Sequence, residues 1–429
     1  MKRLIERILG LLTKMLLRRY KPRVIGVTGS VGKTSAKQAI LAVLGPRYRV
    51  GGTIKNYNNE MGVPLTIIGM KSGGRSILRW LFIFTKAVRM LLWKDKNFPE
   101  VLVLEMGADR PGDIAYLTAL APVDVGVITA IGEAHYEYFH NAEGIKKEKG
   151  MLVTGLSDRG VAILNADNEH TRSLENEIAG KVVTYGFSDE ATVRALDMSI
   201  AYETVSGMVV PTGVQFKLMH EGATVPVVLP GVLGQPHVLA ALASAAVGVA
   251  HGMNVIEISE ALRKFEAPCG RMRLLPGVKH TILIDDTYNA SPLAMVMALD
   301  ALREVDIVEG ARRFAVLGDM LELGKITRVS HEDIGQRLQA FSVDYLITVG
   351  ERAKFIADAA LTHGFPEDSI ASFDDAVEAG KFLEDKLSKG DVVVLKGSQG
   401  VRIEKAVMEV MGDPMFAGQL LCRQDETWN

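Results

Sequence analysis

The chain has 429 residues, which is long for one hydrophobic core, so two or three domains are expected. Its hydrophobic content of 48% and charged content of 23% are those of an ordinary soluble globular protein, and a net charge of −2 gives no reason to expect nucleic-acid binding. The two cysteines, Cys269 and Cys422, lie far apart and form no metal or redox motif, which favours a reducing, cytoplasmic setting.

A basic amphipathic helix is predicted for residues 1–20, because leucine and isoleucine recur at helical spacing among lysines and arginines. Its apolar stretch is too short and too charged to span a bilayer. A second segment, residues 77–93, mixes tryptophan and phenylalanine with basic residues. Both segments are candidates for peripheral contact with an anionic membrane surface, and the alternative is that each packs its apolar face on the protein itself.

The most informative segment is a predicted phosphate-binding loop between Val24 and Ser35, which reads Val-Ile-Gly-Val-Thr-Gly-Ser-Val-Gly-Lys-Thr-Ser. An apolar strand enters a glycine-containing turn, and the turn opens into a helix-prone segment. Backbone amides in such a loop bind phosphate oxygens, the lysine neutralises the outer phosphates, and the Thr hydroxyl can hold Mg²⁺. Val27 stands where the common pattern has glycine, and the alternative is a glycine-rich turn with a chance Lys-Thr pair. The candidate nucleotide-binding residues are Gly29, Ser30, Gly32, Lys33, Thr34 and Ser35.

Further strands and helices alternate after this loop. Continuous β-branched runs, typical of parallel strands buried on both faces, occur at Val101–Leu104, Val125–Thr129 and Gly160–Leu164. Between about Thr192 and Leu229 the pattern alternates, which indicates an antiparallel insertion with turns at Gly207, Gly213 and Gly222. An alanine-rich helix is predicted from Val238 to Val249.

A second α/β unit is predicted from about Gly270. Its candidate strands are Thr281–Ile284, Phe314–Leu317, Tyr345–Val349 and Val392–Leu395. The expected fold is α/β, with a central P-loop-type ATPase domain that has a mostly parallel sheet plus the antiparallel insertion, followed by a Rossmann-like C-terminal α/β domain. The expected boundaries are 1–21 for the basic helix, 22–268 for the central ATP-binding domain and 269–429 for the C-terminal domain. A cleft between two α/β units is a natural nucleotide site.

Three further residues are candidates for metal chemistry. Glu105 closes a strand beside the loop and can hold Mg²⁺, although many strands end in a carboxylate for solubility. His135 follows another strand, and Lys149 lies in a lysine-rich run. The plain interpretation is a structural histidine and a solvated helix face. The functional alternative is a second metal site, since a neutral imidazole can bind Mg²⁺, although oxygen ligands are preferred.

The ordered motifs resemble the Mur ligase family, and most of all its D-alanyl-D-alanine-adding branch. The resemblance covers about residues 22 to 411. Besides the loop, the segments that carry it are Thr53–Thr66, Glu105–Ala108, Gly132–Phe139 with Lys149–Gly150, Gly270–Arg271, Asp285–Pro292, Leu317–Gly324 and Lys396–Ser398.

The resemblance implies a two-metal site that binds ATP and two Mg²⁺ ions. Thr34 and Glu105 would bind the first ion, and His135 with a carbamylated Lys149 would bind the second. It further implies ATP contacts from Arg271, Asp286, Tyr288 and Asn289, and acceptor contacts from Asn58 and Asn59. His331 and Lys396 are candidates for C-terminal substrate contacts, and the alternative is that either residue is structural.

The activity implied by the resemblance is that of an ATP-dependent ligase of peptidoglycan precursor synthesis. It would add D-alanyl-D-alanine to a UDP-N-acetylmuramoyl-tripeptide through an acyl phosphate. We expect a cytoplasmic monomer, and the inner face of the membrane is a candidate location. About 21 residues precede the first strand, so we expect the uridine-nucleotide-binding domain of the family to be absent. The usual His-Asn pair is also missing before the alanine-rich helix, where Gln235 or His237 is a candidate replacement. The alternatives are a related ligase with a pseudomurein or polyglutamate-type product, or a nucleotide-binding membrane scaffold without ligase activity.

Overall fold

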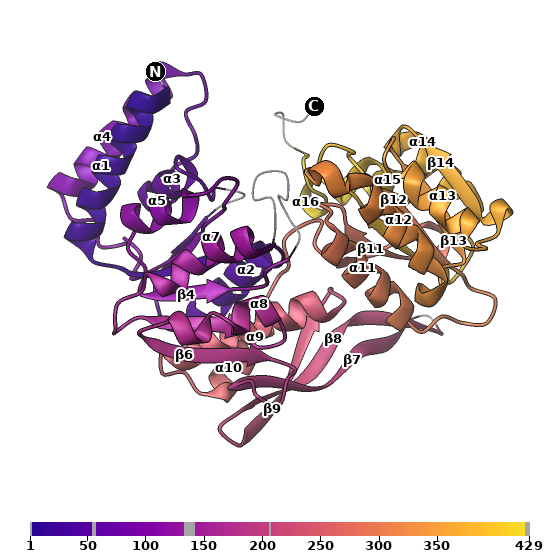
Figure 1. Ribbon diagram of the computed structural model, residues 1–429, viewed down its shortest axis with the longest axis horizontal. Helices are drawn as coiled ribbons and strands as arrows, with labels where there is room; N and C mark the ends of the chain where they lie inside the picture. Colours follow the sequence, from indigo (N-terminus) through magenta and orange to yellow (C-terminus); the bar gives the residue numbers. More distant parts are fainter. Residues whose placement is uncertain (1, 54–56, 133–141, 206, 425–429) are drawn as a thin grey trace.

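Two lobes, each a β-sheet with helices on both faces, flank a central cleft in this protein (Figure 1). The computed structural model describes residues 2–53, 57–132, 142–205 and 207–424. This architecture confirms the predicted α/β fold class, with a large, mostly parallel first sheet and a separate second sheet.

The first sheet has nine strands within the described residues, in the order β2-β3-β1-β4-β5-β6-β7-β8-β9. Their bounds are β1 Arg23–Thr28, β2 Val50–Gly52, β3 Val101–Glu105, β4 Val125–Ile128, β5 Val161–Asn165, β6 Lys181–Gly186, β7 Val193–Val205, β8 Met208–His220 and β9 Ala223–Pro230. Strands β1 to β6 pair in parallel. Because both faces of β1, β3, β4 and β5 are covered, their sequences are mostly apolar without alternation.

Two helical layers cover the first sheet. One face packs against α2 (Lys33–Leu44), α9 (Gln235–Ala250) and α10 (Val255–Leu262). The other packs against α1 (Lys2–Tyr20), α3 (Gly62–Ile68), α4 (Ile77–Leu92), α5 (Asp113–Leu120) and α7 (Ala142–Thr154). Strand β1 shows the division, since Ile25 and Val27 enter the first core and Val24 enters the second. The segment α8 (Glu169–Arg172) is a short helix beyond β5.

The predicted antiparallel insertion is part of the first sheet rather than a separate unit. β7 joins β6 in parallel through Tyr185 and Gly186, and β7, β8 and β9 then pair antiparallel. Gly207 and Gly222 lie in turns with φ of 78° and 80°, as expected, but Gly213 lies inside β8, opposite Pro230. An added Cβ at Gly213 would lie 2.2 Å from the Leu229 carbonyl oxygen, so a close backbone approach, not a turn, explains this glycine.

The second sheet has the order β10-β11-β15-β12-β13-β14. The strands are β10 Arg273–Pro276, β11 Ile282–Asp286, β12 Arg313–Gly318, β13 Tyr345–Val349, β14 Ile370–Phe373 and β15 Val392–Lys396. β10 is antiparallel to β11, and the other pairings are parallel. One face packs against α11 (Pro292–Glu304), α12 (Thr327–Arg337) and α13 (Lys354–Thr362), and the other against α14 (Ala376–Lys386), α15 (Glu404–Val410) and α16 (Ala417–Leu420). Short 3-10 helices are Glu175–Glu177, Val278–His280, Gly324–Ile326, Leu338–Phe341, Glu367–Ser369 and Pro414–Phe416.

The long β7–β8 ribbon connects the two lobes below the cleft (Figure 1). Ile200 of β7 packs against the core of the second lobe, and the Asp306 amide donates a hydrogen bond to the Tyr202 hydroxyl at 2.8 Å. The carboxyl ends of β1 and β3 on one side, and of β11 and β15 on the other, face the same cleft. Ligands of open α/β sheets bind at such edges.

Candidate active site

The loop after β1 turns sharply around Thr129. Gly29 and Gly32 adopt φ of 149° and 87°, conformations that residues with a side chain rarely adopt. An added Cβ at Gly29 would lie 2.0 Å from the Thr129 hydroxyl oxygen. That hydroxyl donates to the Val31 carbonyl at 2.6 Å and so fixes the loop from below. Helix α2 begins at Lys33 directly after Gly32, so its free N-terminal amides face the cleft.

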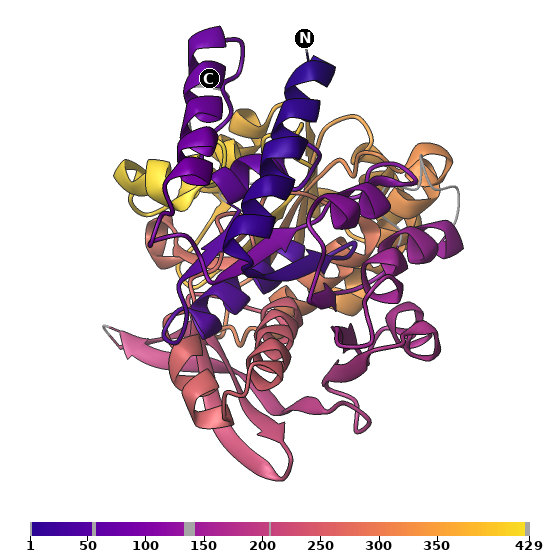
Figure 2. The ribbon, with the colours of Figure 1, turned by 90° about the vertical axis from the view of Figure 1, so that its left-hand side faces the viewer.

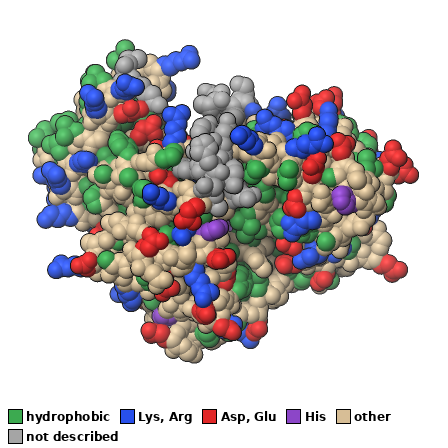
Figure 3. Space-filling model, in the orientation of Figure 1, with side chains coloured by type: hydrophobic (Ala, Val, Ile, Leu, Met, Phe, Trp, Pro, Cys, Tyr) green, Lys and Arg blue, Asp and Glu red, His purple; other side chains and the backbone are tan. Residues whose placement is uncertain are grey.

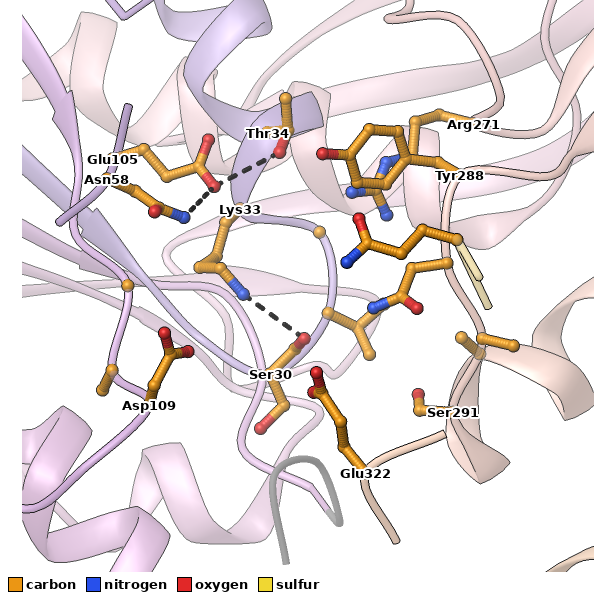
Figure 4. A pocket seen from close by; sticks show the side chains of 18 of the residues that line it. Ser30, Lys33, Thr34, Asn58, Glu105, Asp109, Arg271, Tyr288, Ser291 and Glu322 are labelled. Atoms are coloured by element: carbon orange, nitrogen blue, oxygen red, sulfur yellow. Dashed lines mark hydrogen bonds between the residues drawn. The ribbon is translucent and has the colours of Figure 1, made fainter. Parts of the chain in front are cut away.

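Lys33 is the cation of this loop. Its Nζ donates to the Gly29 carbonyl at 2.8 Å, and the side chain is among those that line the cleft (Figure 4). Burial lowers the pKa of the Lys33 ammonium, while the nearby Glu105 carboxylate acts in the opposite direction. An ammonium with few competing partners at the start of a helix is suited to bind phosphate oxygens.

Glu105 lies at the end of β3 with its two oxygens in different surroundings. Oε1 accepts hydrogen bonds from the Thr34 hydroxyl at 3.4 Å and from the Asn58 amide at 3.3 Å (Figure 4). Oε2 lies 3.3 Å from Nζ of Lys37, which is fully buried one turn further along α2. Among the described residues, Oε2 has this ion pair but no hydrogen bond. Oε1 therefore faces the cavity, whereas Oε2 is paired with Lys37 on the side away from the cavity.

The donors at this position fit Mg²⁺. Within the described ranges, no three His, Cys, Asp or Glu side chains converge on a metal site. Mg²⁺ does not need such a cluster, because it keeps several waters and binds through one or two carboxylates together with substrate phosphates. The Glu105 carboxylate beside the Thr34 hydroxyl, next to a phosphate-type loop, provides that set. The predicted ligand His135 lies outside the described residues.

Lys149 lies on α7 and lines the same cavity, although its side chain is almost fully buried. Burial, and then the positive charge of Lys33, lower the pKa of its amine to about 7. The carboxylates of Asp109 and then Glu148 raise the pKa of this amine, but they do not offset the effect of burial. Glu148 is held in place because it accepts hydrogen bonds from the Gly112 and Ile114 amides at 2.8 Å. A substantial part of the Lys149 amine is therefore neutral, and hence nucleophilic, near neutral pH.

The second lobe supplies the opposite wall. The Arg271 guanidinium lies 4.1 Å from the centroid of the Tyr288 ring, and both side chains face the loop across the cleft (Figure 4). The backbone carbonyl of Arg271 is 2.7 Å from Nε2 of the buried His237 on α9. Burial lowers the pKa of His237 to about 4, so this ring is neutral and donates the bond. Helix α9 of the first lobe thus positions the segment that carries Arg271.

Below this wall lies a buried ion pair. Nζ of Lys396, at the end of β15, is 2.5 Å from Oδ2 of Asp286 and also donates to the Asn289 carbonyl at 2.9 Å. Asp286 Oδ1 accepts from the Met272 amide at 3.2 Å. Burial lowers the pKa of Lys396, and Asp286 partly restores it. These bonds fix the loop that presents Tyr288 and Asn289.

The cleft encloses a cavity of about 280 Å³ between the lobes. The first lobe contributes Ser30, Lys33, Thr34, Asn58, Glu105, Asp109 and Lys149, and the second contributes Arg271, Tyr288, Asn289, Ser291, Glu322 and Gln399. The residues of the first lobe provide a phosphate-type loop, the Glu105 carboxylate and the Lys149 amine. Those of the second lobe provide the Arg271 cation, the Tyr288 ring and several polar groups. This arrangement can hold the phosphates of a nucleotide between the two lobes.

Comparison with known proteins agrees with this geometry. The family model described as the Mur ligase middle domain matches residues 27–78 and 86–248, and the one described as the Mur ligase, glutamate ligase domain matches residues 270–399. The UDP-N-acetylmuramoyl-tripeptide–D-alanyl-D-alanine ligase of Bacillus subtilis is 31% identical over 94% of this chain and 79% of that protein. The chain belongs to the Mur ligase family.

Solved structures agree with the fold of this Mur ligase. MurF ligase from Thermotoga maritima in complex with ADP superimposes with a TM-score of 0.75 at 26% identity, covering 97% of this chain and 84% of that one. MurF from Acinetobacter baumannii has a TM-score of 0.76 at 23% identity, covering 94% and 80%.

The structure brings most of the predicted site residues of this Mur ligase together, but not all of them. Ser35 lines a smaller adjoining cavity with Asp286 and Lys396 rather than the main one. Asn59 closes the turn that precedes α3, since its Oδ1 accepts hydrogen bonds from the Met61 and Gly62 amides.

His331 is fully buried outside the cavity. Its Nε2 accepts from the Met320 amide at 2.9 Å, and its Nδ1 lies 2.6 Å from the Thr327 carbonyl. Both ring nitrogens therefore have backbone partners, and the residue supports the loop after β12 rather than reaching the cleft.

Two contributors escaped sequence reasoning. Lys37 was indistinguishable from the other lysines of a helix, although its spacing of four residues from Lys33 places both on one side of α2. Thr129 follows a strand and carries no motif, and only the glycines that approach it mark its position. Lys37 positions Glu105 and Thr129 positions the loop, and which residues meet in this way depends on the fold.

Proposed function

We propose that this chain is the ATP-dependent ligase that joins D-alanyl-D-alanine to a UDP-N-acetylmuramoyl-tripeptide. One observation supports this above all: the loop cation Lys33 and the carboxylate Glu105 lie in one cavity with Arg271 and Tyr288 of the opposite lobe. Such a cavity can hold ATP between the lobes, with its phosphates on the loop. The likeness to ligases named for this reaction supports the choice of substrates.

The proposed chemistry starts from a peptide carboxylate, which is a poor electrophile. Attack of the carboxylate on the γ-phosphate gives an acyl phosphate and ADP, and the amine of the dipeptide then displaces phosphate to form the amide. Lys33, with the α2 amides, binds the phosphates, and Arg271 adds positive charge from the other lobe. Mg²⁺, held by Thr34 and Glu105, would supply further charge neutralisation. Enclosure between the lobes excludes water, to which an acyl phosphate is sensitive.

Lys149 is proposed to act as a carbamate. A neutral amine is the form that adds CO₂, and the pKa of about 7 makes that form available near neutral pH. The carbamate would provide oxygens for a second Mg²⁺, together with His135. Adding bicarbonate should raise the unfolding midpoint of the native protein and leave that of Lys149→Met unchanged. An equal response of both proteins contradicts the carbamate.

The remaining roles follow from position. Tyr288 and Asn289 are proposed to line the nucleotide site with Asp286 and Lys396 behind them, and Asn58 to face the acceptor.

The enzyme is proposed to work as a monomer in the cytoplasm, at the inner face of the membrane. Light scattering of the purified chain tests the monomer, and a mass of twice the chain contradicts it.

The deciding experiment measures phosphate release from ATP with a UDP-muramoyl-tripeptide and D-alanyl-D-alanine, with mass analysis of the product. We expect release that needs both substrates and a product heavier by the dipeptide less water. Lys33→Met should abolish release, whereas Lys147→Met, an exposed lysine on α7, should not. Stimulation by another amine, such as glutamate, and not by the dipeptide contradicts the proposal in favour of a related ligase. ATP binding without turnover on any acceptor contradicts it in favour of a nucleotide-binding scaffold.

A further inference from the structure

Helix α4 is apolar on two opposite sides. Trp80, Ile83, Ala87 and Met90 pack against the first lobe. The opposite side carries seven large apolar side chains that are 44% to 78% exposed, namely Ile77, Leu78, Leu81, Phe82, Val88, Leu92 and, just past the helix, Trp93. A helix that is hydrophobic all round is normally buried on all sides, so this exposed stripe requires an explanation.

Helix α1 extends the stripe. Leu9, Leu12 and Leu16 face the protein, whereas Leu4 and Leu11 are each 62% exposed on the outer side. The two helices project together from the first lobe, as Figure 2 shows. Their outward sides form one surface, which we call the α1/α4 face and which consists of the seven side chains of α4 above with Leu4, Leu11 and Met15 of α1.

The helices that carry the α1/α4 face are strongly basic, although the net charge of the whole chain is −2. Residues 70–94 contain six lysines and arginines and no acid, and α1 contains six with one glutamate. Arg3, Arg7 and Arg79 are exposed among the apolar side chains. Figure 3 shows hydrophobic and basic side chains intermingled along the left edge of the molecule, over these helices. Charge complementarity therefore points to an anionic partner.

The face is held rigidly. The Tyr20 hydroxyl donates to the Met90 carbonyl at 2.8 Å and accepts from the Asp95 amide at 2.8 Å, which ties the end of α1 to the end of α4. Trp80 Nε1 donates to the Gly74 carbonyl at 3.0 Å and fixes the loop that enters α4. Ordering the two helices on binding thus costs little conformational entropy.

We propose that the α1/α4 face docks on an anionic lipid bilayer, with both helices lying in the headgroup plane. This proposal rests on the inner-membrane location given above and names the surface and the lipid chemistry. The core of a protein–protein interface is depleted in charged residues, whereas here arginines alternate with apolar side chains. In a headgroup layer the apolar side chains reach the acyl boundary while the arginines meet lipid phosphates. Within the described ranges no helix is long and apolar enough to cross a membrane, so the contact is peripheral.

Vesicle sedimentation with the full chain tests this proposal. We expect binding to vesicles of phosphatidylcholine with phosphatidylglycerol, and little binding to phosphatidylcholine alone. The pair Leu78→Ser and Phe82→Ser should weaken binding at least about tenfold through lost apolar burial. The pair Arg3→Glu and Arg79→Glu should weaken it at least about tenfold through lost attraction. The matched control, Ile256→Ser with Val329→Ser, alters exposed apolar residues of α10 and α12 and should bind like the native protein.

A second readout reports the geometry directly. Trp93 is 68% exposed and Trp80 is buried, so brominated lipid should quench part of the tryptophan fluorescence, and Trp93→Phe should remove most of that quenching. All variants should keep ligase turnover on soluble substrates, because the substituted residues lie outside the cavity. If the native protein binds vesicles but shows no ligase turnover, the result contradicts the proposed ligase activity and not the docking.

Several results would overturn the docking proposal. Equal binding to neutral and anionic vesicles would remove the role of charge. Binding that the face variants do not weaken would place the contact elsewhere. Absence of vesicle binding together with a dimer that the Leu78→Ser and Phe82→Ser pair dissociates would make the face an interface between two copies of the chain.

Discussion

Replacing Lys149 with methionine should make the protein more stable and inactive. The folded-state pKa of this amine is about 7, against an ordinary value of 10.5, mainly because burial disfavours the charged form. The unfolded chain therefore binds more protons than the folded one between these two values. In that window stability rises with pH, and the lysine costs the most at and below the lower value.

The size of the effect follows from the same shift. At about pH 7 the buried lysine costs ~4 kcal/mol of unfolding free energy, and at about pH 9 the cost falls to ~2 kcal/mol. Methionine keeps the length of the apolar chain and has no charge to desolvate. Lys149→Met should therefore gain ~4 kcal/mol near neutral pH and about half of that two units higher.

The measurement is urea unfolding of native and Lys149→Met protein at the two pH values, in buffer freed of CO₂ so that the amine stays unmodified. Lys147→Met on the same helix is the control, because that side chain is exposed, and its stability should match the native protein at both values. A variant no more stable than the native protein near neutral pH, or a gain that does not shrink with pH, would refute the reasoning.

Three further predictions concern the cleft and the C-terminal segment. Glu105→Gln should lower ATP turnover about a hundredfold by weakening charge stabilisation at the metal position, with a higher Mg²⁺ concentration for half-maximal rate; an unchanged Mg²⁺ titration would argue against the assignment. Tyr288→Ala removes the ring that lies 4.1 Å from Arg271 and should raise KM for ATP about fivefold with little change in kcat, as measured by steady-state kinetics. Arg423→Ala removes one of the two arginine partners of the fully buried Glu404 carboxylate, the one 2.8 Å from Oε2, while Arg402 still binds Oε1. It should lower the unfolding free energy by ~2 kcal/mol in urea.

The sequence predicted the interior of the fold better than its edges. β13 coincides with the predicted Tyr345–Val349, because a strand buried on both faces reads as an unbroken apolar run. β2, with the sequence Val-Gly-Gly, and the partly exposed edge strand β14 carry no such run and were missed. Propensity is weak for short or edge strands, whose position is set by pairing with a neighbour.

For the site, motifs predicted the loop and Glu105 but not what holds them. The loop binds through its backbone, whose conformation requires glycine at certain positions, and these glycines can be recognised in the sequence. The contact of His237 with the Arg271 carbonyl joins residues 34 positions apart across the lobe boundary, and its signal was only a histidine at an unusual place in the first turn of α9. The position of His331 outside the cavity could not be predicted, since a histidine whose two nitrogens have backbone partners looks the same in sequence as one that faces a substrate.

The two lysines of α2 show why the missed contact matters for the chemistry. Lys33 and Lys37 are one helical turn apart and both lie beside Glu105, yet only Lys33 lines the cavity. Lys37 binds the carboxylate oxygen that faces away from the cleft, which leaves Oε1 directed at Thr34 and Asn58. A lysine in the cavity at that distance would compete with a metal ion for the carboxylate. A lysine behind it keeps the carboxylate oriented while its cavity-facing oxygen remains available to Mg²⁺.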